Sequence, residues 1–444
     1  MSHFPAKCLI VFLFVTSSNV LIAQTSSISN PNSERENNPY SKYGIGELWN
    51  GNSTAIKAMG SITSAFQDPY LINSDNPASY SSLAITTFEG GLSASTRTIS
   101  NAAGSSYSTG TASLAYLNIG IPLGKNAGMS FGLRPMSKTY YAMVDTLYAP
   151  ASPVGTAVRS YAGQGSLSYA FIGAAYRYKG LSVGFNFGYL FGNFQSLTSL
   201  IPDDTLAINR SYESQFERYN HIGGTYWKGG VMYEHKLRDS AYTIRFGGTL
   251  TLGQNLNEKL NNYQISIYNF GDTLVNDTTY NAGDKNGKLK LPMSYSFGVM
   301  LEKTDKWGFG IDYSASDWTG FGSTVDSAFA LGIAAKSYKI AIGGMFTPNV
   351  NDIQNYFSRV TFRFGIYYGA DYIKINNTDI PSYGLTLGGS FPYKRSLRSH
   401  SRLNASLDIG RLGTTANNLL QQNYVRFGLG LTFNERWFIP RKYE

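Results

Sequence analysis

The sequence of 444 residues has one cysteine, four histidines and no long apolar run after its first residues. Cys8 lies inside the N-terminal leader described below, so the remainder of the chain has no thiol and no disulfide. Beyond residue 24, no stretch approaches the ~18 consecutive apolar residues that indicate a transmembrane helix. These absences exclude a disulfide-stabilised secreted protein and a helical membrane protein.

Chemical motifs are missing as well. The histidines have no metal-ligand spacing, and the chain contains no G-x-S-x-G elbow, P-loop, paired cysteines or H-E-x-x-H motif. The catalytic alternative is a serine–histidine pair on adjacent strands, in which His221 or His235 would serve. We predict instead a protein that is not an enzyme, with no catalytic residue, no metal and no cofactor.

The net charge is +9, and a positive excess is typical of nucleic-acid-binding proteins. However, the basic residues stand singly along the chain and do not cluster on one helix. This distribution is typical of solvated and lumenal positions, so we predict no nucleic-acid partner.

Residues 1–23 have the features of a signal peptide. Lys7 supplies a positive charge, residues 8–15 and 20–22 form an interrupted apolar stretch, and Ala23 precedes the predicted cleavage site. A membrane anchor is the alternative, but polar residues 16–19 break the run well short of the roughly 20 apolar residues that an anchor needs. We therefore predict an exported protein.

Glycine, aromatic residues and period-two alternation are abundant. The chain contains 47 Gly, 33 Tyr and 26 Phe, and residues 423–433 alternate without exception between large apolar residues and polar or small ones. Strand side chains point alternately to opposite faces, so this segment has one wholly apolar face. The pattern recurs about a dozen times, as in strands that face lipid outside and a polar lumen inside. We predict an all-β fold, a transmembrane antiparallel β-barrel.

The end of this segment resembles the C-terminal sorting signal of outer-membrane proteins. Arg426, Gly428, Leu431 and Phe433 fit its polar, glycine and large apolar positions. The resemblance implies that the barrel-assembly machinery is a partner. Residues 434–444 follow the signal as a predicted periplasmic tail.

Fourteen strands are predicted, beginning near residues 83, 106, 127, 160, 181, 212, 242, 289, 306, 328, 357, 381, 402 and 422. Short joins at 124–128, 179–180, 237–242 and 304–306 alternate with predicted loops at 145–158, 196–210, 255–288 and 317–327. Short periplasmic turns and long outer loops are typical of outer-membrane barrels, and an even count places both termini in the periplasm. The alternative is a pair of soluble β-sandwiches, but their strands are usually about 5–6 residues long.

Residues 24–81 form a tail and a predicted plug ahead of the barrel, which spans 82–433. About eight strands already leave just enough lumen for side chains to fill, so fourteen need a stopper, here from about residue 39. The matching features are the Ala/Gly/Ser-rich segment that ends in Asn76, Pro77 and Ala78, its place before the first strand, the strand count, and the residues 291–298, 311–313 and 318. Together they resemble the FadL-like outer-membrane transporters of hydrophobic compounds. The resemblance implies an N-terminal hatch in the lumen and lateral exit of the ligand through a break in the third strand.

The predicted third strand contains Gly132 and Pro135. Proline cannot donate to a β-ladder, so Pro135 marks either a local rupture of the wall or a point beyond the bilayer. We take Gly132 and Pro135 as the candidate lateral opening. Arg245, Arg363 and Arg426 fall on lumenal positions and are candidate groups for a ligand carboxylate, with ordinary polar lining as the alternative.

Together these features predict a passive transporter in the outer membrane of a Gram-negative bacterium. Its partners would be a long-chain fatty acid or another hydrophobic small molecule, and outer-membrane lipid. The alternative is a non-enzymatic barrel subunit or carrier in a larger outer-membrane protein secretion complex.

Overall fold

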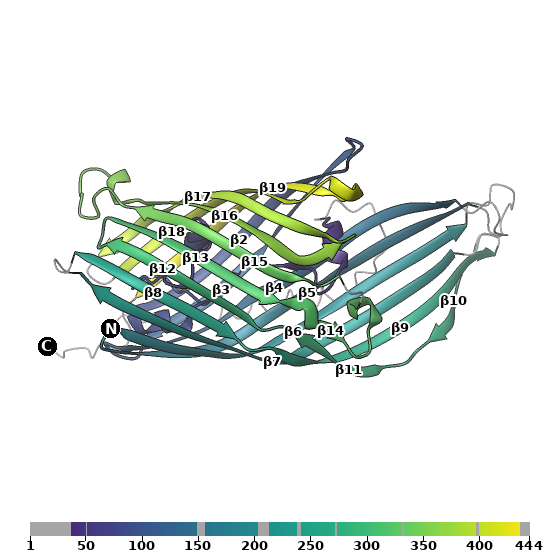
Figure 1. Cartoon of the computed structure of the whole chain (residues 1–444), viewed down its shortest axis with the longest axis horizontal. Helices are drawn as coiled ribbons and strands as arrows, with labels where there is room; N and C mark the ends of the chain where they lie inside the picture. Colours follow the sequence, from purple (N-terminus) through teal and green to yellow (C-terminus); the bar gives the residue numbers. More distant parts are fainter. Residues whose placement is uncertain are drawn as a thin grey trace, which may run out of the picture. The chain divides into compact units, whose positions relative to one another are not determined.

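Strands account for most of the chain, and they form one antiparallel sheet that closes on itself as a 14-strand barrel (Figure 1). The computed structural model describes residues 37–49, 51–148, 156–202, 213–237, 241–270, 273–330, 333–396 and 399–435. The predicted signal peptide, tail residues 24–36 and residues 436–444 lie outside the described residues. No helix in these described ranges is long and apolar enough to cross a membrane.

The wall is built from the following strands: β2 (Thr86–Ser100), β3 (Ser106–Pro122), β4 (Ala127–Tyr148), β5 (Thr156–Tyr178), β6 (Leu181–Pro202), β7 (Glu213–Lys236), β8 (Tyr242–Thr251), β9 (Gln254–Phe270), β10 (Thr273–Asn281), β11 (Lys285–Leu291), β12 (Ser294–Lys303), β13 (Trp307–Asp317), β14 (Gly322–Ser323), β15 (Lys336–Phe346), β16 (Thr361–Ile375), β17 (Thr378–Ser396), β18 (Ser399–Gly413) and β19 (Gln421–Glu435). The segments β8 and β9 both pair with β7 and act as one interrupted barrel strand. Next to it, β10, β11 and β12 form the following interrupted strand. The ladder between β19 and β2 closes the ring.

The predicted strand count is confirmed, and most strands begin within a few residues of their predicted positions. The predicted turn at Lys179 and Gly180 has positive φ at both residues, 46° and 88°, as a tight two-residue hairpin requires. Four predicted loops are wrong in part, because β4, β5, β6, β9, β10, β11 and β14 extend into them. In Figure 1, β9 and β10 extend to the right-hand end of the view together with the other long strands.

The last strand shows how the two faces differ. Phe427, Leu429 and Leu431 are 44%, 41% and 50% exposed on the outer face, whereas Tyr424 and Thr432 on the inner face are buried. An apolar outer face suits lipid, and a buried inner face requires something inside the barrel.

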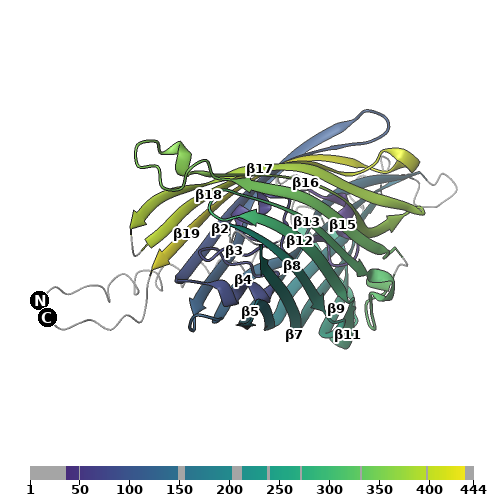
Figure 2. The same cartoon turned by 60° about the vertical axis from the view of Figure 1, so that its left-hand side comes forward.

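Residues 37–49 and 51–81 form a plug inside the lumen (Figure 2). The plug contains η1 (Pro39–Lys42), β1 (Glu47–Leu48) and α2 (Thr54–Lys57), and η2 (Pro77–Ser82) joins it to β2. Helix α2 packs against β17, β18 and β19, whereas η2 packs against β4 to β7. This arrangement confirms the predicted plug.

Wall glycines let the plug backbone approach closely. A Cβ atom on Gly247 would lie 1.8 Å from the Ser64 carbonyl oxygen, and one on Gly365 would lie 2.3 Å from the Gly60 nitrogen. Any side chain at these wall positions would displace the plug. Part of the glycine content is therefore explained by contact with the plug.

Candidate functional site

The Asn-Pro-Ala turn fixes the end of the plug against the wall. The Asn76 side chain accepts a hydrogen bond from the Ala78 nitrogen at 3.1 Å and donates to the Ser64 carbonyl at 2.5 Å. Pro77 occupies the start of η2, where its missing N–H costs nothing. Gly184 faces this turn, and a Cβ there would lie 2.4 Å from Pro77. The motif therefore sets where the plug meets the wall.

The ladder between β3 and β4 is short. It runs from Pro122 paired with Gly128 to Leu117 paired with Leu133 and then stops, although both strands continue. Gly132 lies in the last part of this ladder. A register shift follows Pro135, and β4 continues to pair with β5 on its other side as far as Tyr148.

The plug covers the part of the β4 edge that does not pair with β3. The Trp49 nitrogen donates to the Met136 carbonyl at 2.7 Å, and Glu47 of β1 pairs with Lys138. Farther along, the Asn38 nitrogen donates to the Tyr140 carbonyl at 2.8 Å. Backbone groups inside a membrane wall must be satisfied by protein or water, so this segment of the plug substitutes for a wall strand.

Two clusters of ion pairs hold the plug. Glu47 contacts the guanidinium of Arg97, at 2.8 Å, and that of Arg426. Asp75 contacts Arg134 at 2.8 Å and Lys228 at 2.9 Å. In both clusters the carboxylate belongs to the plug and the two cations belong to the wall.

Two further contacts complete the attachment. Asp68 of the plug lies 3.4 Å from Arg402 of the wall. Asp312 of the wall accepts hydrogen bonds from the plug nitrogens of Thr63 and Ser64, at 2.5 and 2.8 Å. Such charge-assisted bonds are stronger than neutral ones. The plug is therefore held along its length by polar contacts.

The three candidate lumenal arginines all have protein partners. Arg426 binds Glu47, as described. Arg245 lies between Glu234 and Glu302, at 3.2 and 2.5 Å. Arg363 is 2% exposed and donates to the Ser390 hydroxyl. Each has a protein contact in this structure, and their binding of a ligand carboxylate stays a prediction.

A cavity of about 500 Å³ remains between plug and wall. Its charged lining residues are Glu47, Asp75, Asp312, Asp371, Asp408, Lys57, Arg134, Lys228, Lys339 and Arg426. Burying charges against hydrocarbon is costly because they lose their hydration. The lining also includes apolar and aromatic side chains such as Trp49, Met136 and Trp318, so charged and apolar groups share the cavity. The described residues contain no group of three His, Cys, Asp or Glu side chains that could hold a metal ion.

The sequence prediction missed the acidic residues of the plug. Glu47, Asp68 and Asp75 are the carboxylates of residues 37–81, and each meets a wall cation. The sequence could have indicated them, because acidic residues in a predicted plug would face the arginines predicted to line the lumen. The order of the chain does not show which acid meets which arginine.

The barrel, the plug and the short β3–β4 ladder define a plugged barrel of the FadL type. The sequence matches the family model of BamG over residues 6–444, and the chain belongs to the BamG family. No curated protein matches it.

Solved structures share the fold at low sequence identity. The CymD monoaromatic hydrocarbon channel has a TM-score of 0.58 at 14% identity, covering 87% of this chain and 98% of that one. The toluene transporter TodX of P. putida has a TM-score of 0.56 at 14% identity, covering 88% and 99%. A FadL homologue of Pseudomonas aeruginosa has a TM-score of 0.53 at 10% identity, covering 87% and 98%. These similarities confirm the predicted fold.

Proposed function

We propose that this chain is a non-enzymatic barrel of the outer membrane that works as a subunit beside the machinery assembling other β-barrels. The contacts between the plug and the wall of the lumen support this proposal. Ion pairs fasten the plug to two parts of the wall, β2 with β19, and β4. The remaining cavity is lined by charges of both signs. A lumen closed in this way is suited to a structural barrel that other proteins bind. The name of the family, BamG, supports the same association.

The proposed orientation places both termini in the periplasm. The hairpin turn at Lys179 and Gly180 is short, and the strands at the opposite end extend far beyond the apolar belt. About 9–11 residues span a bilayer, whereas β6 has 22 and β7 has 24. The extensions therefore lie outside the cell and offer a large polar surface to partner proteins.

Depletion tests the assembly role. Cells depleted of the chain should accumulate other outer-membrane barrels in their unfolded form, seen as loss of heat-modifiable migration on gels. Re-expression of the chain should restore folding. Re-expression of an unrelated outer-membrane barrel is the control and should not. Normal folding of other barrels after depletion would contradict the proposal.

The second candidate function is uptake of a hydrophobic small molecule, such as a long-chain fatty acid, with lateral exit. The end of the β3–β4 ladder at Leu117 and Leu133 favours it, because the plug covers the remaining edge of β4 by hydrogen bonds that plug movement would release. The solved neighbours include toluene and monoaromatic hydrocarbon transporters. A labelled fatty acid supplied to cells with and without the chain tests this candidate. Equal uptake would contradict it.

A further inference from the structure

The outer face of β6 marks where the lipid belt ends. From Leu181 to Phe191, every second residue is a large apolar side chain that is 43–55% exposed. The next residue on the outer face of β6 is Asn193. Its side-chain oxygen lies 2.7 Å from the Nδ1 atom of His221 in β7. His221 in turn pairs across the ladder with Lys259 of β9. A polar row therefore begins directly beyond the apolar run.

A hollow of about 740 Å³ lies at this boundary. Gly223 of β7 stands between Phe191 of β6 and Asn257 of β9 in the ladders. A Cβ atom at Gly223 would lie 2.8 Å from the Tyr189 hydroxyl, so the absent side chain keeps the hollow open. Aromatic rings therefore form its membrane side, and polar side chains form the other side.

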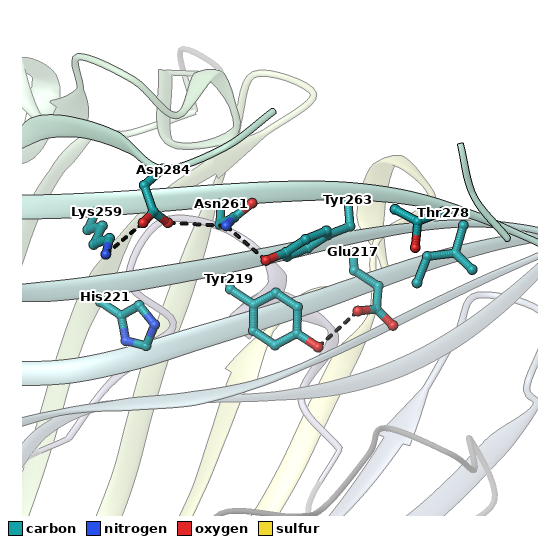
Figure 3. A pocket seen from close by; sticks show the side chains of 9 residues that line it. Glu217, Tyr219, His221, Lys259, Asn261, Tyr263, Thr278 and Asp284 are labelled. Atoms are coloured by element: carbon teal, nitrogen blue, oxygen red, sulfur yellow. Dashed lines mark hydrogen bonds and ion pairs between the residues drawn. The ribbon is translucent and has the colours of Figure 1, made fainter. Parts of the chain in front are cut away.

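A second hollow of about 580 Å³ continues away from the lipid belt (Figure 3). His221 and Lys259 line both hollows. Figure 3 shows Lys259 joined to Asp284, and Asp284 joined to Asn261, on the same outward surface. The two hollows form one groove on the outer face of the barrel, which starts at the apolar belt and extends along the strands away from it.

The start of this groove has an excess of positive charge. The Lys288 ammonium donates to the Asn257 side chain at 2.5 Å, and in the described part of the chain no carboxylate lies within ion-pair distance of it. Lys259 lies 2.8 Å from Asp284, and both side chains are about half exposed, at 52% and 49%. The hydrogen bond from Lys259 holds the pKa of the Asp284 carboxyl below its usual range. Glu258 of β9 faces inward and is 2% exposed.

We propose that this groove binds the phosphorylated headgroup of a glycolipid in the adjoining leaflet. Lys288 and Lys259 would bind the phosphate, because charge-assisted hydrogen bonds to phosphate are the strong ones. Asn193 and Asn257 would bind sugar hydroxyls, and the acyl chains would lie along the apolar outer face of β6. The groove opens onto the lipid belt, so a membrane lipid reaches it without leaving the bilayer. In the proposed orientation this leaflet is the outer one.

The test uses the purified full-length barrel in a mild detergent and counts bound molecules by native mass spectrometry. The probes are diphosphoryl lipid A, the same lipid without its phosphates, and inorganic phosphate. The variant is the double substitution Lys259→Gln and Lys288→Gln. The control is Lys303→Gln, a lysine at the opposite rim that lies 5.0 Å from the Tyr242 ring centroid.

The wild type should retain diphosphoryl lipid A, and the double variant should bind it about tenfold or more weakly, since two charged hydrogen bonds are lost. Lys303→Gln should bind it as the wild type does. Equal affinity of the double variant, equal retention of the dephosphorylated lipid, or full competition by inorganic phosphate would each overturn the proposal. Because the assay needs no partner protein, its result is independent of the assembly role.

Discussion

Substitution of Glu47 by glutamine should loosen the plug without unfolding the barrel. The carboxylate contacts two wall arginines and also accepts a hydrogen bond from the Asn38 side chain at 2.8 Å. The side chain of Arg97 is 1% exposed, so the variant leaves a charge buried without its counter-ion. Glutamine preserves the size of the side chain, which confines the change to charge.

Removing one partner of a buried ion pair typically costs about 3–5 kcal/mol. The barrel strands stay paired, so this loss falls on the docked plug. A loss of about 3 kcal/mol raises the population of the displaced plug by about a hundredfold. The closed barrel should therefore show frequent openings where the wild type shows almost none.

Single-channel recording in planar bilayers measures these openings. Asp284→Asn is the matched control, because its ion pair with Lys259 lies on the outer surface, where such pairs contribute about 0–1 kcal/mol. A double variant, Glu47→Gln with Arg97→Met, should recover part of the closed state, since the buried charge is then absent. If Glu47→Gln barrels open as rarely as the wild type, the carboxylate does not hold the plug.

Three further predictions concern the wall and the plug. Leu429→Arg near the bilayer midplane should cost about 2–4 kcal/mol in unfolding titrations from lipid, whereas Ser294→Arg on the cavity side should cost less; equal costs would contradict the assignment of faces. Leu48 and Ser137 are ladder partners, so cysteines at both positions in the Glu47→Gln barrel should form a disulfide that abolishes its openings until it is reduced; unchanged openings in the oxidised form would contradict plug movement at β4. Deletion of residues 39–81 should raise single-channel conductance, and an unchanged value would show that this segment does not block the lumen.

The barrel could be predicted because lipid imposes a strict pattern. Each strand needs an apolar outer face where it crosses the bilayer, and the alternation of Phe427, Leu429 and Leu431 reports this directly. Beyond the lipid, neither face has to be apolar, so β9 and β10 continue without the alternating signal. The predicted loop over residues 255–288 was wrong in part for this reason.

The details of the site could not be predicted because they depend on distant pairs. Arg426 binds the plug residue Glu47, which lies 379 positions earlier in the chain. Pro135 indicated an irregular third strand, and the structure has a register shift beside it. The sequence contained no sign that plug residues would bond to the free edge of β4. Pairing over such distances follows from the closed barrel and the path of the plug.

Native mass spectrometry of the gently extracted protein tests the proposed function most directly. The chain should be released from native membranes in a complex with subunits of the barrel-assembly machinery, at a fixed stoichiometry and with no hydrophobic small molecule in its lumen. A barrel released without protein partners and carrying a fatty acid or another hydrophobic compound would contradict the assembly role and favour uptake.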